Sequence, residues 1–364
     1  MRLDWVEMRE FRNHAHTRLD PLPDGMVVIA GPNGEGKTNL LEGIFFLYSL
    51  SSPRVSANEP LVAEGSEAAF LRGEYETTGG SVLVEVEVPR KGASRVKVNR
   101  SPVRRRRDLR RQVRAVLFGP FDLPIVIGDP ARRRAFLDEA VVALHPVRDT
   151  IAPAYEKVLR QRNRLLKEWE GRGVPSGLDA WDEQLVDAGA ALIRARADAT
   201  GRLAPAASEE FQDLAGYELL AEYRPHVPAA GDIEEAFREA LARRRPDELV
   251  RRVSLVGPHR DDLELAVRDL GARAFGSHGE TWAAALCLRL GLASAVEAEI
   301  GEPPLVLVDD PFSALDPRRR ANIGSRLAGR GGQVLITVAD EGDVPRVTHT
   351  TYDVHAGSVT RREV

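Results

Sequence analysis

The sequence predicts an α/β fold: a phosphate-binding core, a small antiparallel sheet beside it and a mainly helical insert. Three observations predict this class. An apolar run at 26–30 and an amphipathic run at 39–50 flank a glycine-rich loop, the strand–loop–helix order of a nucleotide-binding core. Alternating runs at 68–76 and 82–88 enclose two glycines and predict a hairpin. From Asp129 onward, apolar residues recur at helical spacing.

The other elements follow in order. Before the loop we expect a strand at 3–11 and a Pro-rich turn at 21–25; after the hairpin, strands at 94–98 and 113–118. Helices are expected at 130–144, 147–170, 178–203, 206–214 and 233–245, with breaks at Pro146, Gly173 and Pro205 and a short strand at 217–223. The α/β pattern returns at Val253, with strands at 263–267, 305–308 and 334–338, helices at 281–299 and 317–327, and a final hairpin.

The composition fits a soluble globular protein, with 43% hydrophobic and 29% charged residues in a chain of 364. No apolar run approaches the roughly 20 residues that span a bilayer, and no signal peptide is evident, so we expect a cytoplasmic protein without membrane contact. Cys287 is the only cysteine, which excludes an intrachain disulfide. Because the net charge is −4, any nucleic-acid binding must come from local basic patches.

The glycine-rich loop is a P-loop. It consists of Gly31, Pro32, Asn33, Gly34, Glu35, Gly36, Lys37 and Thr38, with Asn39 next. Its glycines let backbone N–H groups converge on phosphate oxygens, and the following helix adds its positive N-terminus. Lys37 is expected to reach the β- and γ-phosphates, and the Thr38 hydroxyl to hold Mg²⁺.

A Walker B pattern provides the partner that a P-loop needs. The apolar strand 305–308 ends in Asp309 and Asp310. Asp309 is expected to bind Mg²⁺ through water opposite Thr38, and Asp310 to orient the attacking water. The cofactors predicted are therefore ATP and Mg²⁺, with Lys37, Asp309 and Asp310 as catalytic residues.

Two further motifs resemble those of ABC-type ATPases. Ser313-Ala314-Leu315-Asp316 is similar to their D-loop, and Gly276-Ser277-His278-Gly279-Glu280 to their signature. The resemblance implies that Ser277 and Gly279 contact ATP held by another copy, so that ATP joins a head-to-tail homodimer. The wide separation of the two Walker motifs resembles the SMC-like branch, but the insert lacks sustained heptads and is expected to form a compact arm. The expected domains are a head at 1–128 and 253–364 and an arm at 129–252.

Several stretches together resemble the RecF family of DNA replication and repair proteins over nearly the whole length. They are Phe11-Arg12-Asn13, the P-loop, 130–138, Gly257-Pro258-His259-Arg260-Asp261-Asp262 and Asp309-Asp310. The resemblance implies an ATP-dependent dimer that clamps double-stranded DNA and duplex–single-strand junctions near gaps. It also implies RecR as a partner and, with RecO, a role in loading RecA.

The chain departs from the expected patterns in three ways. Glu280 stands where the signature usually ends in Gln, the switch histidine of transporters is absent near Thr337 and Asp340, and Asp310 is one methylene shorter than the usual glutamate. A shorter base reaches the water less well, so we expect a slow, DNA-stimulated ATPase that acts as a switch.

Other residues carry weaker signals. The family resemblance implies that Arg12 and Asn13 lie near the nucleotide, although a surface turn is the alternative. Asp122 occupies the place of a Q-loop and is a possible magnesium sensor. His259 is expected to be a hydrogen-bonded structural residue, and Arg260 a contact to DNA or between lobes.

The stretch 90–114 is the strongest candidate for DNA contact, because its many cations face Asp108 alone. Its core is Arg104, Arg105, Arg106, Arg107, Arg110 and Arg111. Contacts of Arg with phosphates give salt-sensitive affinity that is independent of base sequence. Aromatic residues are few here, which favours duplex backbone over stacked single strands.

Two alternatives stay open. One is a nucleotide-gated interaction protein whose arm recruits partners while DNA contact is secondary. The other is a GTPase or small-molecule kinase, but Thr337-Val338-Ala339-Asp340 lacks the Asn-Lys of a guanine motif. A transporter ATPase is disfavoured by the insert and by the missing switch histidine.

Overall fold

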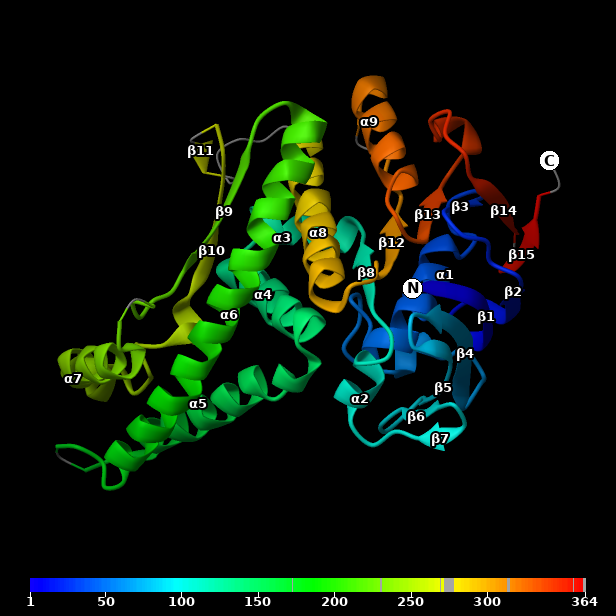
Figure 1. The fold of residues 1–364 in the computed structure, drawn as a ribbon. Helices are drawn as coiled ribbons and strands as arrows, with labels where there is room; N and C mark the ends of the chain where they lie inside the picture. Colours follow the sequence, from blue (N-terminus) through cyan, green and yellow to red (C-terminus); the bar gives the residue numbers. More distant parts are fainter. Residues whose placement is uncertain are drawn as a thin grey trace. The chain divides into compact units, whose positions relative to one another are not determined.

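A six-stranded mixed sheet brings together strands from the N-terminal and C-terminal parts of the chain (Figure 1). The computed structural model describes residues 1–171, 173–229, 231–268, 270–271, 278–312, 315–355 and 357–362. The strand order is β15 (Ser358–Arg361), β14 (Thr350–His355), β3 (Met26–Ala30), β13 (Val334–Val338), β12 (Leu305–Asp309) and β8 (Ala115–Phe118). All neighbours are parallel except β14 and β15. Strands β3, β13, β12 and β8 are mostly apolar and are buried along their length, as expected for parallel strands covered on both faces.

A second six-stranded sheet is antiparallel. Its order is β2 (His14–Leu19), β1 (Arg2–Phe11), β4 (Ala68–Thr77), β5 (Gly80–Pro89), β6 (Arg95–Val98) and β7 (Ser101–Pro102). Buried and accessible residues alternate along β4 and β5, so one face of this sheet packs on the core. Helix α1 (Lys37–Ser49) contacts strands of both sheets and is buried along almost its whole length. It fills the core between them.

The chain separates into two compact units. The head unit comprises Met1–Leu123, Ala206–Glu218 and Phe275–Val364, and the arm unit comprises Pro124–Pro205 and Leu219–Ala274. The ranges expected from the sequence differ at three places, because the arm begins at Pro124, 206–218 groups with the head and the arm continues past 252. The remaining helices of the head are α2 (Arg106–Arg110), α8 (His278–Ile300) and α9 (Pro317–Ala328).

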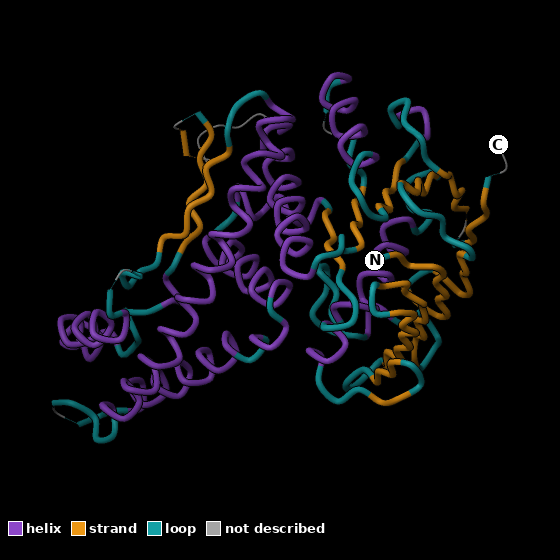
Figure 2. Tube along the Cα trace, viewed as in Figure 1, coloured by secondary structure: helices purple, strands orange, loops and turns teal. Residues whose placement is uncertain are grey.

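The arm unit is mainly helical, as Figure 2 shows. Its helices are α4 (Pro130–Leu144), α5 (Ile151–Glu168) and α7 (Ile233–Arg251), while α3 (Leu123–Ile127) and α6 (Leu178–Ala215) cross the unit boundaries. A three-stranded antiparallel sheet joins β9 (Leu219–Arg224), β10 (Asp262–Val267) and β11 (Leu270–Gly271). Its separate core includes Tyr155, Ile193 and Phe237. No helix of the described residues is both long enough and apolar enough to cross a bilayer.

The predicted α/β class, the hairpin at 68–89 and the C-terminal hairpin are confirmed. The predicted break at Pro205 is wrong, because α6 continues through it. The proline ring is exposed, while Leu203, Ala207 and Phe211 keep one face of the helix buried on either side. Strand β2 was not predicted, since its two histidines and its arginine hide a simple alternation.

Candidate functional site

At two glycines of the P-loop, a side chain would collide with neighbouring atoms. Gly31 donates its N–H to Val338 O (3.3 Å), and a Cβ on it would lie 2.4 Å from Val354 O. Gly36 has a φ of +109°, and a Cβ there would lie 2.6 Å from the Asn13 amide nitrogen. Neighbouring strands therefore press on the loop, and only glycine permits that approach.

The Lys37 side chain turns back onto the loop. Its Nζ donates to Gly31 O (2.6 Å) and Pro32 O (2.9 Å). Burial lowers the pKa of Lys37, while the nearby charges of Asp309, Asp310 and Glu35 oppose this shift. The ammonium group thus bonds to neutral carbonyls rather than to a carboxylate, and phosphate oxygens could replace those carbonyls.

The Walker B strand brings its first carboxylate to the P-loop threonine. Thr38 Oγ1 lies 2.9 Å from both Asp309 carboxylate oxygens. Thr337, which is paired with Asp309 across β12 and β13, donates to Asp309 Oδ1 (2.7 Å) and accepts the Asp310 N–H (3.0 Å). Asp310 itself has a φ of +53°. Thr337 therefore positions both aspartates. From the sequence, Thr337 is notable only as a residue near the place of the missing switch histidine.

These oxygens fit a magnesium ion. Mg²⁺ prefers a few hard oxygen donors from the protein and takes the rest from water and substrate phosphates. Thr38 and Asp309 supply a hydroxyl and a carboxylate side by side. Among the described residues there is no cluster of three or more His, Cys, Asp or Glu that could hold a metal without such help.

Asn13 lies against the P-loop. Its amide donates to Glu35 O (3.1 Å), and its oxygen accepts from Asn39 Nδ2 (2.8 Å). His14, which is fully buried, has Nε2 3.0 Å from Gly36 O and Nδ1 3.1 Å from Gly357 O. This histidine connects the loop to the β14–β15 turn, and no role in the site was predicted for it from the sequence.

Arg12 points instead to α1. Its guanidinium forms two hydrogen bonds with the Glu42 carboxylate (2.9 and 3.0 Å) and donates to Pro60 O (2.9 Å). Arg54, which the sequence analysis did not single out, bonds Glu42 (3.1 Å) and Asn39 Oδ1 (2.7 Å). Glu42 is 1% exposed, so the two arginines compensate a buried carboxylate beside the start of α1.

The remaining predicted site residues are spread over the head unit. Asp122 is buried and accepts from Arg289 Nη2 (2.7 Å) and the Gly119 N–H (3.1 Å), so its carboxylate is bonded to protein donors. Asp316 caps α9 through the N–H groups of Arg318 and Arg319 (both 3.0 Å). Gly279 lies in the first turn of α8, where Tyr217 donates to Glu280. Ser277, Ser313 and Ala314 lie outside the described residues.

The basic stretch contains β6, β7 and the short helix α2, and its core, 104–111, is a short loop followed by α2. Arg90, at the start of the stretch, donates to Ser66 O (3.0 Å) and Ala63 O (2.7 Å). The side chains of Arg104, Arg105 and Arg111 are exposed. Arg110 differs, because its Nη2 donates to Ser49 O (2.7 Å) at the end of α1. The stretch therefore combines accessible cations with others that anchor it.

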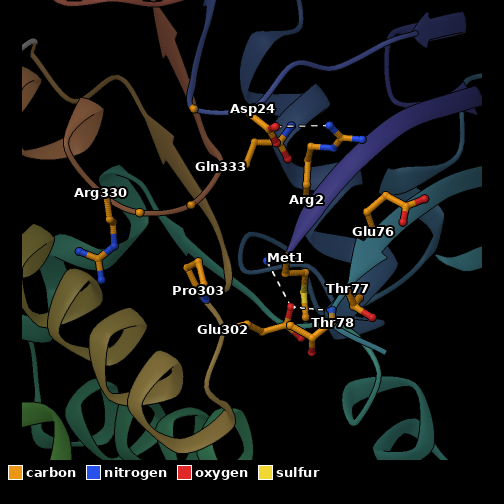
Figure 3. Close-up of a pocket in the computed structure, with 13 residues that line it drawn as sticks. Met1, Arg2, Asp24, Glu76, Thr77, Thr78, Glu302, Pro303, Arg330 and Gln333 are labelled. Atoms are coloured by element: carbon orange, nitrogen blue, oxygen red, sulfur yellow. Dashed lines mark hydrogen bonds and ion pairs between the residues drawn. The ribbon is translucent and has the colours of Figure 1, made fainter. Parts of the chain in front are cut away.

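A hollow of about 560 Å³ opens at the amino ends of the strands of the mixed sheet (Figure 3). Gly25, Pro303 and Gln333, which precede β3, β12 and β13, line it. Glu302 accepts from the Thr78 N–H (3.1 Å) and lies 3.4 Å from the Met1 amino group. Its polar groups fasten the start of the chain, whereas the P-loop residues lie at the opposite strand ends.

The fold and this arrangement define an ABC-type ATPase head of the SMC-like kind. The RecF/RecN/SMC N-terminal domain family matches residues 2–359. The SMC head of Pyrococcus furiosus shares the fold, with a TM-score of 0.57 at 14% identity over 100% of this chain and 96% of that one.

The chain belongs to the RecF family of DNA replication and repair proteins. RecF of Streptomyces avermitilis is 42% identical over 99% of this chain and 100% of its own length, and RecF of Frankia alni is 41% identical over the same shares. A structure of the recombination mediator RecF with ATP, from the RecFOR pathway, has a TM-score of 0.88 at 28% identity and covers 99% of this chain and 97% of that one.

Proposed function

We propose that this protein is an ATP-switched, DNA-binding recombination mediator. ATP binding joins two copies head to tail into a clamp on duplex DNA near single-strand gaps and duplex–single-strand junctions. There the clamp helps RecO and RecR to load RecA, and slow, DNA-stimulated hydrolysis of ATP resets it. The names of the relatives and the ATP-bound RecF structure support this proposal.

The observation that carries the proposal is the meeting of Lys37, Thr38 and Asp309 at one end of the mixed sheet. Lys37 would exchange its two carbonyl partners for β- and γ-phosphate oxygens. Thr38 and Asp309 would hold Mg²⁺, which supplies charge neutralisation on the phosphates when bound. The backbone N–H groups of 33–38 and Asn39 would complete the cradle.

Asp310 is the proposed general base for the attacking water. Thr337 holds the Asp310 N–H (3.0 Å), and so fixes the backbone from which a short side chain must reach. Slow turnover suits a switch, because the closed state then lasts long enough to act on DNA. Asn13 would line the nucleotide site, and Arg12 would act on it through Glu42 and α1.

The dimer is proposed to place Ser277, Gly279 and Asp316 of one copy against the triphosphate in the other. Asp122 would connect this region to α8 through Arg289. In the DNA-bound state, Arg104–Arg107 and Arg111 would face phosphates, while Arg110 keeps the stretch on the core.

Sedimentation velocity with ATP, with ADP, and with ATP plus duplex DNA tests the switch. We expect the wild type to dimerise with ATP, both with and without DNA, but not with ADP. Both Lys37→Met and Ser277→Arg should stay monomeric in every condition. Lys157→Met, which changes an exposed lysine on α5, is the control and should behave as wild type. Normal pairing of Ser277→Arg with ATP would refute the sandwiched nucleotide.

Charge reversal tests the DNA contact. Arg104→Glu with Arg105→Glu should weaken duplex binding and make its salt slope shallower by about 2, because two phosphate contacts are lost. Arg160→Glu with Arg164→Glu makes the same change in net charge on α5, where both arginines are exposed. Equal effects of the two double variants would remove this stretch from the proposal.

A further inference from the structure

The turn Gly257–Asp262 in the arm unit is held by a dense polar network. Asp261, fully buried, accepts from Arg196 Nη1 (3.1 Å), from the Tyr223 hydroxyl and from the His226 N–H (2.8 Å). His259 accepts from Tyr155 OH (2.6 Å) and lies 3.2 Å from Ser254 O. These bonds fix the backbone of the turn.

Asp262, the last residue of the turn, is also paired. Its two oxygens accept from Arg133 Nε (2.6 Å) and Nη2 (2.8 Å). Arg260 is different, because its side chain is exposed. Its backbone N–H donates to Gly257 O (3.0 Å), but its guanidinium group has no hydrogen bond or ion pair in the part of the chain that the structure describes. The one cation of the turn without a structural task is thus carried on a rigid backbone.

Two more donors lie close to the turn. Arg134 donates to Asp261 O (2.9 Å), a neutral acceptor, and among the described residues no ion pair joins its guanidinium to a carboxylate, although the charges of Asp261, Asp262 and Asp138 act on it from nearby. His226 is exposed, and its Nδ1 accepts the Gly257 N–H in a long hydrogen bond (3.5 Å). The other ring nitrogen, Nε2, is the atom that would contact a ligand. Partial burial of the His226 ring is the main cause of its lowered pKa, and the positive charge of Arg260 adds to the shift. This agrees with their proximity.

The balance of charge around the turn is positive. Four guanidinium groups, of Arg133, Arg134, Arg196 and Arg260, face three carboxylates, of Asp138, Asp261 and Asp262, and all three carboxylates already bond Arg133 or Arg196. Another nearby cation, Arg244, pairs with Asp247 (2.8 Å). The surplus therefore lies on Arg260, beside Arg134 and His226.

We propose that Arg260, with Arg134 and His226, binds a phosphate of the DNA backbone, so that the arm unit carries its own DNA contact apart from the basic stretch of the head. Guanidinium groups suit phosphate because their planar N–H groups match its oxygens. A fixed turn loses little entropy on binding. This inference rests on the proposed function, because it assumes that the protein holds duplex DNA.

Duplex affinity measured against salt concentration, with ATP, tests the proposal. Arg260→Gln should weaken two unrelated duplexes equally, by about tenfold, and make the salt slope shallower by about 1. Arg260→Lys should restore the salt slope, since it keeps the charge, but only part of the affinity, since an ammonium lacks the planar N–H groups. Arg160→Gln, an exposed arginine on α5 of the same unit, is the matched control.

The outcomes separate this inference from the proposed function. No duplex binding by the wild type would refute the function itself. Wild-type binding with an unchanged slope in Arg260→Gln, or with the same change in Arg160→Gln, would overturn only the phosphate site. An acidic protein partner that loses affinity for Arg260→Gln while DNA binding is unchanged would also overturn it. Thermal melting of each variant confirms that it is folded.

Discussion

Two buried polar clusters in this protein use similar residues in opposite ways. In the loop cluster of the head (Lys37, Thr38, Asp309 and Thr337), the ammonium bonds backbone carbonyls although three carboxylates are near. In the turn cluster of the arm (Arg196, Tyr223, Asp261 and Asp138), Arg196 bonds both aspartates. The comparison teaches that a buried cation bonded only to neutral oxygens is ready for an anion, whereas a cation bonded to carboxylates holds the fold.

The largest effect expected from this comparison is on stability. Asp261→Ala leaves Arg196 and Tyr223 buried without their shared acceptor, and breaking a buried pair costs about 3–5 kcal/mol. Urea unfolding, followed by the fluorescence of the chain, should show this loss. Asp187→Ala, at an exposed position of α6, should change the free energy of unfolding by less than about 0.5 kcal/mol.

The second prediction concerns activity. Asp309→Asn keeps an acceptor for Thr38 and Thr337 but removes the charge that holds Mg²⁺. ATP hydrolysis should therefore fall by about a hundredfold or more, with little change in unfolding free energy. Phosphate release and thermal melting measure the two quantities. A loss of stability as large as that of Asp261→Ala would contradict the distinction between the clusters.

Asp24→Asn provides a control for the second prediction. Asp24 lies just before β3, at the end of the mixed sheet opposite the P-loop. It pairs with Arg2 (3.5 Å) and is largely exposed. Its variant should hydrolyse ATP as the wild type does.

The third prediction is a pH dependence that belongs to the turn. Burial lowers the pKa of His259 to about 4, below the usual value of about 6.5 in an unfolded chain. Between these values only the unfolded state binds the proton, so His259 costs stability as the pH falls from about 6.5 to 4. The slope is at most about 1.4 kcal/mol per pH unit.

His259→Gln should remove this contribution and flatten the curve of unfolding free energy against pH in that range. His355→Gln changes an exposed histidine in the head and should leave the slope as it is. Parallel curves for the wild type and His259→Gln would show that the turn does not exclude the proton.

Much of the head could be predicted from the sequence because its signals are local. The strand before the P-loop and the Walker B strand are apolar runs, and each ends at chemically distinctive residues. The partners of side chains could not be predicted in this way. The family resemblance implied that Arg12 lies near the nucleotide, but its bonds go to Glu42, which lies one helical turn beyond Thr38 and is buried by tertiary packing.

Pro205 shows the same limit for a helix. A proline removes one backbone hydrogen bond, and this loss predicts a break. Burial of Leu203, Ala207 and Phe211 on one face of α6 depends on distant parts of the chain and outweighs the local loss. Residues such as His14 and Thr337 give no local signal, because their roles arise only when strands are brought side by side.

The smallest expected effect is a change in stability at the start of α8. It tests whether the polar residues there hold the fold, as in the turn cluster, or are kept for a ligand, as in the loop cluster. Tyr217 donates to Glu280, so this carboxylate has a partner within the head unit and resembles the turn cluster more than the loop cluster. Tyr217→Phe should cost about 1 kcal/mol of unfolding free energy, as one hydrogen bond is lost. Glu280→Gln keeps an acceptor oxygen and should cost less.

A double-mutant cycle isolates the pair, because the effect of Glu280→Gln on stability should become smaller once Tyr217 is phenylalanine. Chemical unfolding of the four proteins without nucleotide gives the coupling energy. If Glu280 were instead reserved for the nucleotide of a second copy, Tyr217→Phe would leave stability unchanged, and Glu280→Gln would alter dimerisation with ATP. A Glu in place of the usual Gln would then be a feature of the dimer, and not of the fold of the single chain.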